Sequence, residues 1–163
     1  MSISATPPSI EKFIKDLQKF GVKMKRRQTL AFLKAGEVVV GTAKNYCPMS
    51  ETAGQISARL KTKKRTEQED IHPGRLAQSI RLMSYDDKHA AIGVPSNSKA
   101  GDYASKIHDE KGSSWDDYGP GTLAKQRSGY KAREKFISRA VVDETDAIIT
   151  IFSKQIERAL SDL

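Results

Sequence analysis

Two stretches of helical periodicity, one toward each end of the chain, constrain the fold more than any other feature. The C-terminal stretch begins at about Arg133; its apolar residues recur at spacings of three, four or seven, and charged residues occupy the opposite face. The apolar positions are Ile137, Val141, Ile148, Phe152, Ile156, Ala159 and Leu163, with Thr145 in the one gap. This pattern predicts a long amphipathic helix with one face on the core.

The first part of the N-terminal stretch predicts a flexible tail, residues 1–8, followed by a short helix. Ser9 is a suitable N-cap for this helix, and Gly21 is a suitable residue to end it. The apolar stripe consists of Ile10, Phe13, Ile14, Leu17 and Phe20. Helical spacing of these five residues predicts a short amphipathic helix with one apolar face.

A longer helix is predicted next, from about Lys23 to Tyr46, because Pro48 cannot continue it. Its stripe consists of Thr29, Phe32, Leu33, Gly36, Val39, Val40, Ala43, Tyr46 and Cys47. Gly36 and Ala43 are small, so they predict that another helix or a sheet approaches this face closely.

Residues 49–72 have no periodicity and are dominated by Ser, Thr, Lys, Arg, Glu and Gln. A loop of this length within a compact domain is uncommon, and it is usually functional or disordered. The composition predicts a polar, basic loop that becomes ordered only in an assembly.

A β-hairpin is predicted after this loop. Residues 76–85 read as a short turn of helix that leads into a strand, residues 86–88 as the hairpin turn, and residues 89–94 as the second strand. Beyond a polar loop, Asp102 is expected to cap another short helix, and residues 112–129 are rich in turns. The chain is therefore predicted to be a single α+β domain over residues 1–163, with long N-terminal and C-terminal helices packed on a small antiparallel β-sheet, a short helix and long loops.

The composition limits the classes of function. The net charge of +8 and the pI of about 9.6 are consistent with nucleic acid or an acidic protein as partner, or with solubility alone. Two clusters hold much of this charge: residues 23–27 and residues 59–65, and neither contains interleaved aromatic residues that could stack on bases. Each basic cluster taken by itself is read as a solvated face or loop. No apolar run is long enough to span a bilayer and no signal peptide is recognised, so no membrane partner is expected. The single cysteine, Cys47, excludes an intramolecular disulfide and a cysteine-based zinc cluster.

No pattern in the sequence indicates catalysis. The histidines, His72, His89 and His108, lack metal-binding spacing, and there is no nucleophile elbow or phosphate-binding loop. Cys47 adjoins a proline at an apolar helix end, which predicts a buried thiol instead of an activated one. The sequence therefore predicts no catalytic residue, no metal site and no cofactor, and the protein is not expected to be an enzyme.

Five short motifs occur in a recognisable order. They are Tyr46-Cys47-Pro48 at a helix end, Leu76-Ala77-Gln78-Ser79-Ile80 after Pro73-Gly74, Ala91-Ile92-Gly93-Val94, the segment from Tyr103-Ala104 to Gly112, and Lys131 to Ile137. This order, over residues 30–160, resembles the bacteriophage tail-completion proteins, also called minor tail or virion morphogenesis proteins. Thr52-Ala53-Gly54 is similar to the start of the family's second motif, whereas the rest of that motif is delayed until Leu76–Ile80, so the residues between them are an insertion relative to the family's pattern.

The resemblance implies a structural component of a tailed-bacteriophage virion. Such a protein would form a homo-oligomeric ring, hexameric or dodecameric, at the head–tail junction, and would contact neighbouring neck, connector or tail proteins and transiently the DNA in the channel. It would be made in the cytoplasm of the host bacterium and carried in the tail or neck of the particle. The residues expected at subunit or partner interfaces are Arg59, Lys61, Lys63, Lys64, Arg65, Pro73, Gly74, Arg75, Tyr103, His108, Glu110 and Trp115.

The basic charge supports an alternative from another class. A non-enzymatic nucleic-acid-binding protein could use residues 49–72 as a flexible arm, with contacts to phosphates that weaken steeply as salt rises. The two interpretations differ in what orders this loop, which is protein in the first and nucleic acid in the second.

Overall fold

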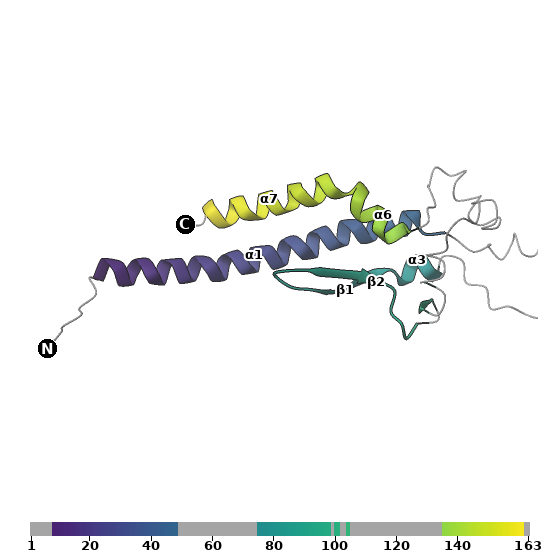
Figure 1. The fold of residues 1–163 in the computed structure, drawn as a ribbon, viewed down its shortest axis with the longest axis horizontal. Coiled ribbons are helices and arrows are strands. Elements are labelled where there is room, and N and C mark those ends of the chain that lie inside the picture. The colour runs from purple at the N-terminus through teal and green to yellow at the C-terminus, as the bar shows by residue number, and fades with distance from the viewer. Residues whose placement is uncertain (1–7, 49–74, 99, 102–103, 105–134, 162–163) are drawn as a thin grey trace, which may run out of the picture.

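The computed structural model describes residues 8–48, 75–98, 100, 101, 104 and 135–161. Its elements, in order, are α1 (Pro8–Tyr46), α3 (Arg75–Ser79), β1 (Arg81–Tyr85), β2 (Ala90–Gly93), α6 (Phe136–Asp143) and α7 (Thr145–Ser161). The helix α1 is the axis of the molecule: the hairpin β1–β2 and the pair α6–α7 both pack along it, and α7 runs back toward the N-terminus (Figure 1). The predicted α+β class is confirmed.

Helix α1 is a single helix of 39 residues, so the predicted division at Gly21 is wrong. Gly21 keeps a right-handed helical backbone, whereas a glycine that ends a helix usually takes the left-handed conformation. A glycine inside a helix costs about 1 kcal/mol relative to alanine, which strong helix formers on both sides readily offset. The helix also begins at Pro8, a favoured first residue, so Ser9 lies inside the helix and not at its cap.

The C-terminal half of α1 carries most of the core, as its stripe predicts. Val39, Ala43 and Cys47 are buried at every fourth position, and they join Leu76, Ile80, Phe136 and Ala140 in one cluster. Gly36 is also buried, and a Cβ atom placed on it would lie 2.7 Å from Cδ1 of Leu82 in β1. The expected close approach of a sheet to this face of α1 is therefore confirmed.

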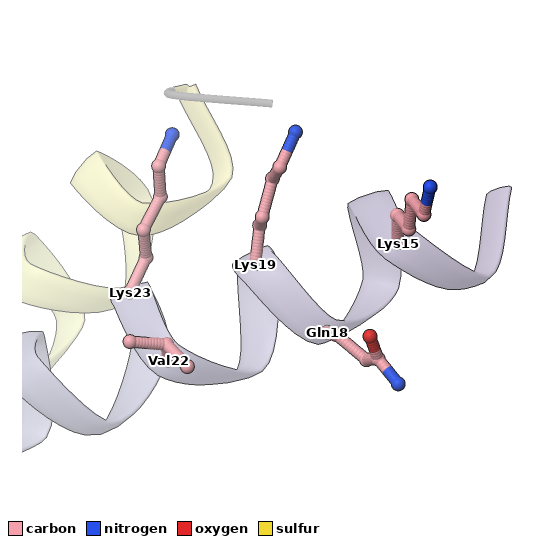
Figure 2. A pocket seen from close by; sticks show the side chains of 5 residues that line it. All are labelled: Lys15, Gln18, Lys19, Val22 and Lys23. Atoms are coloured by element: carbon pink, nitrogen blue, oxygen red, sulfur yellow. The ribbon is translucent and has the colours of Figure 1, made fainter. Parts of the chain in front are cut away.

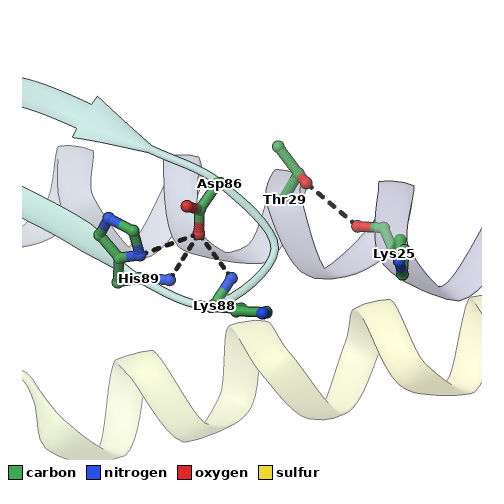
Figure 3. A network of polar contacts seen from close by, with 5 residues as sticks. All are labelled: Lys25, Thr29, Asp86, Lys88 and His89. Carbon is green, nitrogen blue, oxygen red and sulfur yellow. Dashed lines mark hydrogen bonds and ion pairs between the residues drawn. The ribbon is translucent and has the colours of Figure 1, made fainter.

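The hairpin follows the predicted turn at residues 86–88. Strands β1 and β2 pair antiparallel, with an irregularity in register between Leu82 and Ser84. Asp86 organises the turn: its Oδ1 accepts hydrogen bonds from the backbone N–H groups of Lys88 (2.7 Å) and His89 (2.9 Å) and lies 3.1 Å from Nδ1 of His89 (Figure 3). The same two backbone bonds, from Lys88 and then His89, hold the pKa of the Asp86 carboxyl below its ordinary value.

The predicted single C-terminal helix is two helices, because the chain breaks at Glu144. The backbone of Glu144 leaves the helical conformation (φ −96°, ψ 11°), and the Thr145 hydroxyl bonds to the carbonyl oxygens of Val141 and Val142 at 3.2 and 2.8 Å. Two of the predicted core positions, Val141 in α6 and Ile156 in α7, are exposed, because the neighbouring residues Ala140 and Gln155 take the buried positions instead.

Helix α1 holds this break in place with two side chains. Thr42 Oγ1 donates a hydrogen bond to Glu144 Oε1 at 2.6 Å, and the Tyr46 hydroxyl donates to Asp143 Oδ2 at 2.7 Å. Farther along, the rings of Phe32 and Phe152 pack edge to face with centroids 4.9 Å apart. These contacts fix α7 along the middle of α1.

Candidate functional site

The residues expected at interfaces fall almost entirely outside the described part of the chain. Arg75 is described; it begins α3 and is half-buried. The residues that lie outside are Arg59, Lys61, Lys63, Lys64, Arg65, Pro73, Gly74, Tyr103, His108, Glu110 and Trp115. Residues 49–72, the predicted polar loop, and the predicted cap Asp102 lie outside as well.

The described residues contain no arrangement typical of a catalytic centre. Over residues 8–48, 75–98 and 135–161, no three His, Cys, Asp or Glu side chains come close enough to hold a metal ion. The predicted buried thiol is confirmed: Cys47 is fully buried, and its Sγ lies 3.5 Å from the carbonyl oxygen of Pro48. The His89 side chain contacts Asp86 in the hairpin turn, with Nδ1 3.1 Å from Asp86 Oδ1. Within the same residues, no helix is both long and apolar enough to cross a membrane.

A polar hollow of about 400 Å³ lies between the α3–β1 junction and the turn after β2. It is lined by Gln78, Ser79, Arg81, Pro95, Asn97 and Ser98. The turn satisfies its own polar groups, because Ser98 Oγ donates to the Pro95 carbonyl at 2.6 Å and accepts from Gly101 N at 3.1 Å. The Ser98 hydroxyl that lines this hollow is therefore already paired within the turn, and we assign no binding role to the hollow.

The first turns of α1 form the most unusual surface. Figure 1 shows α1 running past the end of α7 and past the tip of the hairpin, so that its N-terminal turns stand apart from the other elements. We call residues 8–22 the α1 arm. Four large apolar side chains, which we call the arm stripe, are exposed along one face of it by 46, 62, 46 and 53%: Ile10, Phe13, Ile14 and Leu17.

The arm stripe continues the packing face of α1. Ile10, Leu17, Met24 and Ala31 are spaced by seven residues, and seven residues are close to two helical turns. Exposure falls along this row, from half-exposed Ile10 and Leu17 through the partly buried Met24 to Ala31, which is buried. The arm therefore presents to solvent the same face that the body of α1 buries.

The opposite side of the α1 arm is basic. Lys15, Lys19 and Lys23 follow one another at every fourth residue, and Figure 2 shows their amino groups extending to the same side of the helix. With Gln18 and Val22 they line an open hollow of about 500 Å³. Residues 11–27 carry seven basic and two acidic side chains, a net charge of +5 against +8 for the whole chain.

A second exposed apolar row lies on α7. Ile149, Ile156 and Leu160 are exposed by 58, 41 and 51%, and their spacings of seven and four place them on one face of the helix. We call these three residues the α7 stripe. The face of α7 that meets the core instead contains Ile148, Gln155 and Ala159. The sequence showed apolar periodicity here but gave no signal that separates the covered face from the uncovered one.

Comparison with known proteins adds no relative: no family model and no curated protein matches the sequence, and no solved structure matches the fold.

Proposed function

We propose that this protein is a structural subunit of a tailed-bacteriophage virion, a neck or tail-completion protein that assembles into a closed ring at the head–tail junction. The observation that carries the proposal is the pair of exposed apolar helix faces, the arm stripe and the α7 stripe. Contiguous apolar side chains on a protein surface mark sites of protein–protein contact more often than chance allows.

The two faces belong to different helices, and this favours a ring. A contact between two different surfaces is heterologous, so each subunit gives one face and receives the other, and the series closes into a ring when the rotation permits. Many weak contacts then hold one another in place, because each link raises the effective concentration of the next. A small virion subunit present in several copies needs this property.

The order of local structures supports the family as well. The motif ending in Pro48 closes a long helix, residues 76–80 pass from α3 into the hairpin, and residues 91–94 span the end of β2. These are the elements that the resemblance to tail-completion proteins implies at these positions.

Electron microscopy of the purified protein in negative stain tests the proposal. We expect closed rings with an open centre, in one size class. Isolated particles of monomer size at every concentration would count against ring formation and remove the main support for a role at the junction.

A second candidate function follows from the basic side of the α1 arm. The row Lys15, Lys19 and Lys23 and the net charge of +5 over residues 11–27 suit a contact with nucleic-acid phosphates. A monomer that shifts DNA at low salt and loses this binding as salt rises would favour this function. The variant Lys15→Gln/Lys19→Gln should then weaken binding and reduce its salt dependence.

A further inference from the structure

We infer that the arm stripe of one copy of this chain packs on the α7 stripe of the next copy. The inference rests on the proposed function and goes beyond it, because it names the two surfaces that meet. One surface is Ile10, Phe13, Ile14 and Leu17, and the other is Ile149, Ile156 and Leu160. The contact is a helix on a helix, and the partner is a second copy of the same chain.

The first argument is continuity with a contact that already exists inside the subunit. Helix α7 packs along the body of α1, and its Phe152 meets Phe32. Helix α1 extends beyond the point where α7 ends (Figure 1), and the seven-residue row from Ile10 to the buried Ala31 continues its packing face into the arm. The α7 stripe of another copy, laid against the arm, would cover the part of this face that the subunit's own α7 does not reach.

The second argument is that the α7 stripe cannot cover the arm stripe of the same chain. Helix α1 is unbroken from Pro8 to Tyr46, so the arm cannot fold back over α7. The α7 stripe also lies on a different face of α7 from the residues that meet the core, Gln155 and Ala159. The two stripes can therefore meet only between copies.

The third argument is charge, which disfavours the pairing of two arms. The α1 arm carries three basic and two acidic side chains, a net charge of +1, and the basic residues 23–27 follow it directly, so two arms lying side by side would place an excess of like charge together. The described residues of α7 contain two acidic side chains, Asp146 and Glu157, and two basic ones, Lys154 and Arg158, and so are neutral overall. The arm meets less repulsion on α7 than on another arm.

The fourth argument is the size of the contact. Seven half-exposed large side chains offer roughly 100 Å² each, or roughly 700 Å² together, by the usual areas of such residues. This is about half of the ~1,600 Å² of a typical stable interface. One such contact would hold a dimer only weakly, whereas a closed ring gains from making the contact at every subunit.

Disulfide trapping between variants that each carry one introduced cysteine, beside the buried Cys47, tests the pairing directly. Leu17→Cys and Ile156→Cys are prepared separately, one with a size tag, and mixed under mild oxidation. Wild-type protein is the negative control: its one cysteine, Cys47, is fully buried, so it should form no disulfide-linked dimer. We expect the mixed dimer to exceed both homodimers by several-fold. A matched control mixes Lys15→Cys, on the other side of the arm, with Ile156→Cys, and this mixture should give several-fold less mixed dimer.

The outcomes separate this inference from the proposed function. A majority of Leu17→Cys homodimers would mean that arms pair with arms, which overturns the inference. Rings in the wild type together with no excess of mixed dimer would also overturn it, while the proposed function stands. Absence of both rings and mixed dimers would overturn both the inference and the proposed function.

A disruption pair gives an independent check. Leu17→Glu places a charge in the arm stripe and should abolish the oligomer, while Val22→Glu, at a residue that is 71% exposed on another face of the same arm, should leave it unchanged. Circular dichroism confirms that both variants keep their helix content. Equal loss, or equal retention, of the oligomer in the two variants would contradict the inference.

Discussion

Two glycines five residues apart on α1 allow the packing of the hairpin to be measured. Gly36 is buried against β1, and a Cβ there would lie 2.7 Å from Leu82 Cδ1 and 3.4 Å from Cδ2. Gly41 is exposed, and no described atom comes within 4 Å of the position that a Cβ would take. The substitutions Gly36→Ala and Gly41→Ala therefore change the helix in the same way and the packing in different ways.

The expected magnitudes follow from these distances. Alanine is favoured over glycine inside a helix by about 1 kcal/mol, and Gly41→Ala should raise the free energy of unfolding by about that much. Carbon atoms in contact prefer a separation of about 3.5–4.0 Å, so Gly36→Ala forces Leu82 to move by roughly 1 Å. Overpacking of this kind costs about 1–3 kcal/mol, which outweighs the gain in helix propensity. Gly36→Ala should thus destabilise the protein by about 0–2 kcal/mol net.

Urea unfolding, monitored by far-UV circular dichroism, measures the change in the free energy of unfolding for both substitutions. A double-mutant cycle with Leu82→Ala isolates the contact: in that background the clash is removed, and Gly36→Ala should become stabilising by about 1 kcal/mol. The reasoning would be refuted if Gly36→Ala stabilised the wild type as much as Gly41→Ala does. It would also be refuted if the cycle showed no coupling between the two positions.

Three further outcomes are expected. Gln155 is only 4% exposed, and its Oε1 has no hydrogen-bond partner among the described residues. Gln155→Leu should therefore raise the free energy of unfolding by about 1–2 kcal/mol, as measured by thermal or urea denaturation. A lower free energy of unfolding would contradict this and show that the amide has a partner. Thr42→Val leaves the Glu144 carboxylate without its donor and should lower stability by about 1–2 kcal/mol, and no change in the urea midpoint would contradict this. The pKa of Asp86 is lowered in the folded state, so its stabilising effect is complete above the unfolded pKa of about 3.9 and is lost as pH falls through the folded value. An NMR titration should place the folded pKa below about 3.9, and Asp86→Asn should flatten the acid limb of the stability profile; a higher pKa would exclude this.

Local signals made much of the body predictable from the sequence. Pro48 ends α1 because a proline cannot continue a helix and restricts the residue before it, and residues 86–88 form the expected turn because Asp86 bonds to the backbone of the two residues that follow the turn's centre. Gly36 predicted a close approach because its lack of a side chain leaves room for a neighbour. Each of these features depends on a few adjacent residues.

The features that were missed depend on distant residues. The break at Glu144 is held by Thr42, a hundred residues earlier, and no local pattern announces that hydrogen bond. Gly21 was read as a helix end, although the same residue is tolerated inside a helix when its neighbours favour that state. Periodicity identified the apolar face of the arm but not its exposure, because exposure depends on whether another element covers the face.

The measurement that tests the central claim most directly is the mass of the purified wild-type protein by light scattering over a wide range of concentration. Self-association through the arm stripe and the α7 stripe predicts one oligomer larger than a dimer, with a mass that reaches a plateau because a ring is closed. A mass that stays at 18.1 kDa at all concentrations would contradict the account. So would a mass that rises without limit, since that behaviour belongs to an open filament.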